Sequence, residues 1–188
     1  IASDWNLNGL RFPVQWVNRP QNPTDPTLHD FRGVSGQIAG GIVKKGQKIM
    51  VLPSGLKSIV KEIYTYDGPL QEAFCPQSVT LVLEDDLDVS RGDMVVGMTE
   101  LPGMSSDLTA RVCWMHPRPL QAGKKYFMKH TSHNVQVVVS ALESRINILT
   151  FEPEPDVSEL PMNGIGQIKL RASRPIVFDG YAANAAGR

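Results

Sequence analysis

The residues of this chain that could do chemistry are scattered, and their spacing fits no metal site. His130 and His133 lie three apart, so on an extended strand the two imidazoles point to opposite faces. No cysteine or carboxylate lies close enough in sequence to complete a zinc site with them. The acidic run Glu84–Asp88 lacks the glycine and the distal glutamate of a calcium loop. We expect a solvated loop there and no metal ligand.

Nucleotide chemistry and hydrolysis lack their motifs as well. A phosphate-binding loop needs Gly-x4-Gly-Lys-Ser/Thr, whereas Gly40–Gly41 and Gly164–Gly166 have neither the lysine nor a strand-to-helix context. Ser54 lacks the Gly-x-Ser-x-Gly elbow of a hydrolase. Arg91–Asp93 spells an integrin-binding tripeptide but is expected to be a turn. The sequence therefore predicts no catalytic, cofactor-binding or metal residue in this chain.

Composition excludes several other classes. The 19 basic and 19 acidic residues cancel, which argues against a dedicated nucleic-acid surface. The aromatic residues that could stack on bases are therefore expected in the core: Trp16, Tyr64, Trp114 and Phe127. No apolar run approaches the ~20 residues of a membrane span. The two cysteines have no metal-like spacing, so we expect reduced thiols and a cytoplasmic protein.

Apolar and polar residues alternate through most of the chain, which is typical of half-buried β-strands. In the central stretch Val34–Ala39 alternates, and Gly40–Gly41 then interrupts the strand where a positive φ would fit. Turns at Lys44–Gly46 and Pro53–Gly55 enclose another strand at Gln47–Leu52. Further strands are expected at residues 10–16, 59–66, 78–83, 94–96, 108–114, 125–130 and 167–173. Short strands with frequent turns predict an all-β fold.

The proline-rich segment Glu152–Pro155 must be a loop, like Pro20–Pro26. Before it, Val135–Ala141 is so apolar that both its faces are expected to be covered, and Asn147–Phe151 is predicted to be another strand. One face of the strand at residues 167–173 is expected to be exposed to solvent, and it carries Gln167, Lys169, Arg171 and Ser173. No convincing helix longer than about two turns is found.

A domain boundary is predicted at Leu101–Gly103, because it separates two runs of strands. Residues 1–8 would be a linker, 9–101 a first β-barrel and 102–188 a second.

One set of motifs resembles the second domain of translation-factor-type GTPases: Arg32-Gly33-Val34-x-Gly36-x-Ile38, Gly41, Val43-Lys44-Lys45-Gly46 and Leu52-Pro53-Ser54-Gly55. The sequence of these motifs is most similar to that of the GTPase subunit of bacterial sulfate adenylyltransferase (ATP sulfurylase). Some forms of this subunit are fused to adenylyl-sulfate kinase. The likeness continues through Cys113–Trp114, Tyr126–His130, Asn147 and Arg174–Asp179. It implies two tandem small antiparallel β-barrels like domains two and three of elongation factor Tu, the second lacking its last strand.

The resemblance also implies a function. The parent would form adenylyl sulfate from ATP and sulfate, with hydrolysis of GTP, bound with Mg in a domain absent here, as the driving force. Adenylation would be carried out by a separate small subunit, and this chain would be a non-catalytic module that contacts both that subunit and its own GTPase domain. The alternatives are the tRNA-binding barrels of a translation elongation factor-like GTPase and a free-standing binding module.

Overall fold

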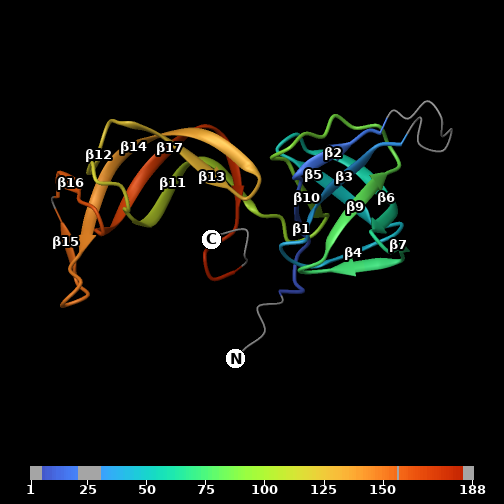
Figure 1. Ribbon diagram of the computed structural model, residues 1–188, viewed down its shortest axis with the longest axis horizontal. Coiled ribbons are helices and arrows are strands. Elements are labelled where there is room, and N and C mark those ends of the chain that lie inside the picture. Colours follow the sequence, from blue (N-terminus) through green and yellow to red (C-terminus); the bar gives the residue numbers. More distant parts are fainter. Residues whose placement is uncertain (1–5, 21–30, 156, 184–188) are drawn as a thin grey trace. The chain divides into compact units, whose positions relative to one another are not determined.

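The described part of the chain is built from β-strands. A computed structural model describes residues 6–20, 31–155 and 157–183, and all the elements placed in them are strands (Figure 1). They form two compact units. The first unit takes residues 6–104 with His130–His133 and residues 177–183, and the second takes residues 105–129 and the described residues of 134–176. Within the described residues, no helix has the length and apolarity that crossing a membrane requires.

The first unit is an antiparallel sheet that closes on itself. Its strands are β1 (Arg11–Pro13), β2 (Trp16–Asn18), β3 (Gly33–Gln37), β4 (Ile42–Lys44), β5 (Lys48–Leu52), β6 (Leu56–Thr65), β7 (Gly68–Leu70), β8 (Glu72–Phe74), β9 (Ser78–Leu83) and β10 (Met94–Gly97). The main sheet runs β1-β10-β5-β6-β9-β3-β2. It closes because Arg11 N donates to Gly40 O at 2.8 Å and Ala39 N donates to Arg11 O at 2.8 Å.

The core of this unit follows from the alternation. Inward-facing side chains of successive strands pack together, and the largest fully buried ones are Phe12, Ile38, Ile49, Ile63 and Leu81. Most of their polar neighbours on the same strands face outward, as expected for strands with one buried face, but Arg11 and Ser58 are buried. A closed sheet of this kind leaves few unpaired edges.

Gly41 occupies the predicted break after β3. Its φ is +79°, a conformation that residues with a Cβ adopt at a cost. Its backbone is held at both ends, because its N–H donates to Asn6 O at 2.7 Å and its carbonyl accepts from Cys75 N at 3.1 Å. A Cβ here would lie 2.6 Å from Leu10 Cα, which is backbone and cannot move aside freely. Both the conformation and the space require glycine.

Gly41→Ala should therefore lower the free energy of unfolding by about 2–4 kcal/mol, from the positive φ and the overlap together. Gly46→Ala is the matched control, because Gly46 has φ +81° but nothing within 4 Å of its Cβ position. It should lose about 1 kcal/mol. Denaturant midpoints measure both, and equal losses would show that the overlap with Leu10 is relieved at no cost.

A buried ion pair joins the two ends of the first unit. Arg11 is 5% exposed, and its Nε and Nη2 donate to the two Asp179 carboxylate oxygens at 2.7 and 2.8 Å. Its Nη1 donates to Leu10 O at 3.0 Å. Removing one partner of such a pair leaves a buried charge uncompensated, and the loss of stability is then large.

Asp179→Ala should lower the free energy of unfolding by about 3–5 kcal/mol, because it leaves the buried Arg11 guanidinium without its partner. Asp107→Ala is the control, since it removes an equally bidentate but exposed pair with Arg171 and should leave the thermal midpoint near that of the wild type. Similar midpoints for the two variants would show that burial of Arg11 carries no penalty.

The second unit is a curled antiparallel sheet. Its strands are β11 (Gly103–Cys113), β12 (Leu120–Gln121), β13 (Lys125–His130), β14 (His133–Ile146), β15 (Pro153–Pro155), β16 (Glu159–Leu160) and β17 (Ile165–Phe178). The sheet runs β11-β17-β14-β13, β15 pairs with β14, and β12 pairs with β16. Its core includes Val135, Val137, Leu160, Ile168 and Leu170.

Two predictions for this unit are wrong. Asn147–Phe151 is a turn between β14 and β15, not a strand. The segment Glu152–Pro155, predicted to be a loop, contains strand β15. Proline is tolerated there because β15 pairs with β14 alone and so needs few backbone donors.

Other strands differ from the sequence pattern in smaller ways. Val135–Ala141 buries one face only, because Gln136 and Ser140 are exposed. The strand expected at residues 10–16 is divided into β1, which pairs with β10, and β2, which pairs with β3. Strands β7 and β8 were not predicted. Of the predicted loop Pro20–Pro26, residues 21–26 lie outside the described residues.

Candidate binding surfaces

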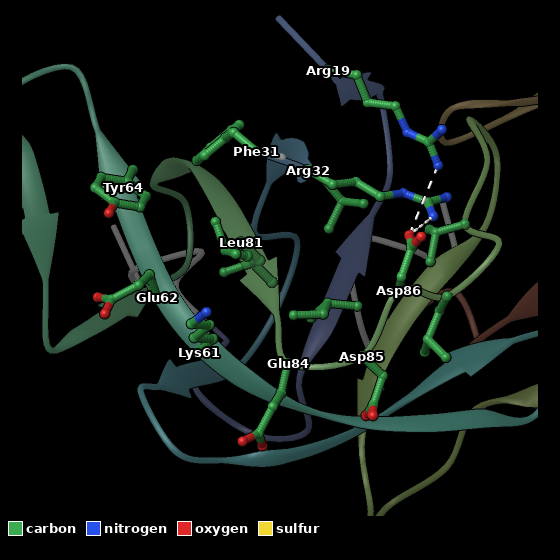
Figure 2. Close-up of a pocket in the computed structure, with 15 residues that line it drawn as sticks. Arg19, Phe31, Arg32, Lys61, Glu62, Tyr64, Leu81, Glu84, Asp85 and Asp86 are labelled. Atoms are coloured by element: carbon green, nitrogen blue, oxygen red, sulfur yellow. Dashed lines mark hydrogen bonds and ion pairs between the residues drawn. The ribbon is translucent and has the colours of Figure 1, made fainter. Parts of the chain in front are cut away.

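The first unit carries a hollow of about 700 Å³ beside strands β6 and β9. Figure 2 shows Tyr64 with Lys61 and Glu62 on one side of it, and Arg19, Arg32 and Asp86 together at the other side. The Phe31 and Tyr64 rings meet edge to face, with centroids 6.1 Å apart. The lining of the hollow is thus a mixture of charged and aliphatic side chains with two aromatic rings.

Three charged groups of the hollow, Arg19, Arg32 and Asp86, are engaged with one another. Arg32 Nη1 donates to Asp86 Oδ1, and Arg19 lies 3.9 Å from the same oxygen. The hydrogen bond from Arg32, followed by its charge, holds the pKa of Asp86 below its usual range. Ser58 Oγ donates to Asp85 Oδ2 at 2.8 Å. Two carboxylates of the run Glu84–Asp88 therefore already have partners in the chain.

The two histidines lie in the hairpin between β13 and β14. Thr131 there has φ +52°, and Ser132 is buried with no hydrogen-bond partner for its hydroxyl. His133 packs against Gly92, where an added Cβ would be 3.3 Å from the imidazole ring. Among the described residues, no group of three or more His, Cys, Asp or Glu is placed to hold a metal ion.

Asp93 lies in the turn that begins at Ser90, as predicted for Arg91–Asp93. Burial raises the pKa of its carboxyl; the hydrogen bond from Ser90 N and the charge of His133 oppose this rise, and Asp88 adds to it. The folded protein therefore binds this proton more tightly than the unfolded chain does. Stability contributed by the protonated carboxyl is present below the unfolded pKa and is lost as the pH rises through the folded pKa.

Asp93→Asn should consequently be more stable than the wild type at pH 7, because the amide is neutral and its oxygen still accepts from Ser90 N. The difference in thermal midpoint should shrink as the pH falls through the raised pKa toward about 4. A midpoint difference that stays constant over this range would contradict the assignment to Asp93.

Ser54 and the glycine pairs have structural roles. Ser54 Oγ donates to Val51 O at 3.1 Å and so closes the turn after β5. Gly164 packs so closely that an added Cβ would be 2.8 Å from Leu160 Cδ1. Cys75 is buried, Cys113 is exposed, and both are free thiols. These positions shape turns and packing.

The predicted wet face of β17 is exposed, but its charges are paired. Lys169 Nζ lies 2.7 Å from Glu143 Oε1, and Gln167 Nε2 donates to Glu143 Oε2 at 2.8 Å. The hydrogen bonds from Lys169 and then Gln167 lower the pKa of Glu143. Arg171 pairs with Asp107. A partner would have to displace these cross-strand contacts.

The expectation that the aromatic residues are core residues is wrong for two of them. Trp16 is 66% exposed and Phe127 is 86% exposed. Trp114 packs against the second core, and its Nε1 donates to Arg118 O at 2.7 Å. The turn at residues 147–152 carries further exposed apolar side chains. The sequence did not reveal them, because Asn147–Phe151 was predicted to be a strand.

The sequence of the chain is similar to known proteins over almost its whole length. Residues 107–188 match the GTP-eEF1A C-terminal domain-like family. Over 184 residues, 98% of the chain, it is 45% identical to the bifunctional enzyme CysN/CysC of Rhodopirellula baltica. Over 186 residues, 99% of the chain, it is 42% identical to sulfate adenylyltransferase subunit 1 of Teredinibacter turnerae. Over nearly its whole length the chain is homologous to part of sulfate adenylyltransferase subunit 1. It spans 27% of the first of these relatives and 38% of the second.

Solved structures agree with this family at the level of the fold. The structures of Sup35 complexed with GDP and with GMPPNP cover 97% of the chain, with TM-scores of 0.84 and 0.82. Sequence identity is 14% and 16%, and the chain spans 43% of each Sup35 chain. This likeness concerns the fold alone, and it confirms the predicted all-β fold of tandem barrels.

Proposed function

We propose that this chain is a non-catalytic β-barrel module of the GTPase subunit of sulfate adenylyltransferase. The full enzyme would join ATP and sulfate into adenylyl sulfate and pyrophosphate, with GTP hydrolysis driving the reaction. The observation that carries the proposal is the 42% identity to a sulfate adenylyltransferase subunit 1 over 99% of the chain. Arg32 and Asp86 in the hollow, and Lys169 and Arg171 on the β17 face, already have partners within the chain.

The reactive groups of the enzyme would lie outside this module. GTP and Mg would be held by a GTPase domain of the same subunit, and adenylation would be carried out by a small second subunit. The name subunit 1 among the relatives supports a multi-subunit enzyme. The barrels would hold the GTPase domain and present a surface to the small subunit. Free thiols at Cys75 and Cys113 fit the reducing cytoplasm in which we place the enzyme.

If this function is correct, the module alone should not bind nucleotides. Residues 1–188 alone should show no saturable binding of a fluorescent GTP analogue, because they contain no phosphate-binding loop. The full native protein containing them, purified with its small subunit, should release pyrophosphate from ATP and sulfate in a GTP-dependent manner. Saturable GTP binding by residues 1–188, or a full protein that binds tRNA and forms no adenylyl sulfate, would contradict the proposal.

A further inference from the structure

The turn between β14 and β15 presents three large apolar side chains to solvent. We call residues 147–152 the hairpin tip. Within it Ile148 is 65% exposed, Leu149 is 85% exposed and Phe151 is 80% exposed. Figure 1 shows this hairpin, in orange, extending beyond β12 and β16 in the second unit. A turn in water is usually polar, so three such side chains in four residues require an explanation.

The hairpin tip is an ordered turn. Asn147 Oδ1 accepts from Leu149 N at 2.9 Å and from Thr150 N at 3.3 Å. The backbone closes the turn, since Asn147 N donates to Glu152 O at 2.9 Å and Phe151 N donates to Asn147 O at 2.7 Å. One asparagine thus satisfies the donors that would otherwise leave the turn free to rearrange.

A polar cluster fixes the base of the hairpin tip. Arg145 Nε and Nη2 both donate to Glu154 Oε2, at 3.0 and 2.6 Å, and Asn147 Nδ2 donates to Glu154 Oε1 at 2.8 Å. The hydrogen bond from Arg145, followed by that from Asn147, lowers the pKa of Glu154. The carboxylate therefore joins both strands of the hairpin to the turn above them.

Phe151 is held in an unfavourable conformation. Its φ is +61°, a region that bulky residues rarely adopt and that asparagine or glycine would occupy more readily. Strain of this kind persists only where the surrounding contacts impose it, and it is concentrated at functional sites. The turn therefore keeps an exposed aromatic ring at a position where a small polar residue would be more stable.

An arranged group of exposed apolar side chains has the properties of a binding hot spot. Aromatic and aliphatic anchors supply most of the energy of an interface when they enter a pocket of the partner. Because the turn is already ordered, little conformational entropy is lost on binding. The hairpin tip would then be the anchor of a larger contact, since three side chains cover only part of a standard interface.

The names of the relatives favour a separate polypeptide as the occupant. The hairpin tip belongs to the second unit. The relatives are named as one subunit of an enzyme. The charged face of β17 is already paired within the chain.

We propose that the hairpin tip is the docking anchor for the small adenylating subunit, which would receive Ile148, Leu149 and Phe151 in an apolar pocket. This proposal rests on the proposed function, because that function supplies the partner.

The test uses the full native protein that contains this chain, titrated by calorimetry with the small subunit of the same organism. Leu149→Ser removes an anchor, and Phe151→Asn removes the ring while suiting the positive φ, so the latter should fold at least as well as the wild type. Each should raise the dissociation constant by about 10-fold or more. Phe127→Ser is the matched control, because Phe127 is 86% exposed on β13 of the same unit. It should change the dissociation constant by less than about 2-fold.

The outcomes separate the two proposals. Binding by the wild type that is unchanged in Leu149→Ser and Phe151→Asn, or weakened equally in Phe127→Ser, would overturn the role of the hairpin tip and leave the proposed function intact. No binding by the wild type would instead count against the proposed function. Self-association that depends on the hairpin tip, seen by light scattering, would assign the surface to a second copy of the chain and overturn the docking proposal.

Discussion

The buried ion pair between Arg11 and Asp179 is the contact on which the arrangement of the first unit depends. Arg11 makes three kinds of contact. Its backbone closes the barrel by hydrogen bonds to residues 39 and 40, and its strand β1 pairs with β10. Its guanidinium binds Asp179, in the segment after β17. Leu10, directly before it, packs against Gly41 so closely that no Cβ fits. Residues near both ends of the described chain, such as Leu10 and Asp179, are thereby fixed within one barrel.

Several charged side chains on the surface of the described chain pair with one another. Arg32 with Asp86, Lys169 with Glu143 and Arg171 with Asp107 each join neighbouring elements of one unit. Such exposed pairs contribute little stability, but each removes a group that could have bound a nucleotide or a metal ion. Because these basic and acidic side chains are paired, the net charge of the chain does not indicate a charged binding partner. It also leaves exposed apolar side chains as the more informative feature.

Strands with one buried face could be predicted from the sequence because alternation records burial directly. The central stretch from Val34 to Gly55 was correct in its strands, its glycine break and its turns. Prediction failed where a local side-chain contact overrides the alternation pattern. Ile148, Leu149 and Phe151 have the composition of a buried strand, yet the side chain of Asn147 folds them into a turn. Trp16 and Phe127 were assigned to the core because composition cannot tell which face of a strand is covered. An asparagine just before an apolar run that ends at prolines was the available signal.

The hairpin tip is joined to the rest of the molecule by hydrogen-bonded strands. Strand β14 runs from His133 to Ile146 beside the tip. From Val137 onward it pairs with β17, with register shifts between Val139 and Ala141 and between Leu142 and Ser144, and at its end it also pairs with β15. A flexible loop would dissipate a force applied at its end, whereas a strand bonded on both sides passes it on. A partner held at the hairpin tip would therefore act, through β14 and β15, on the sheet of the second unit.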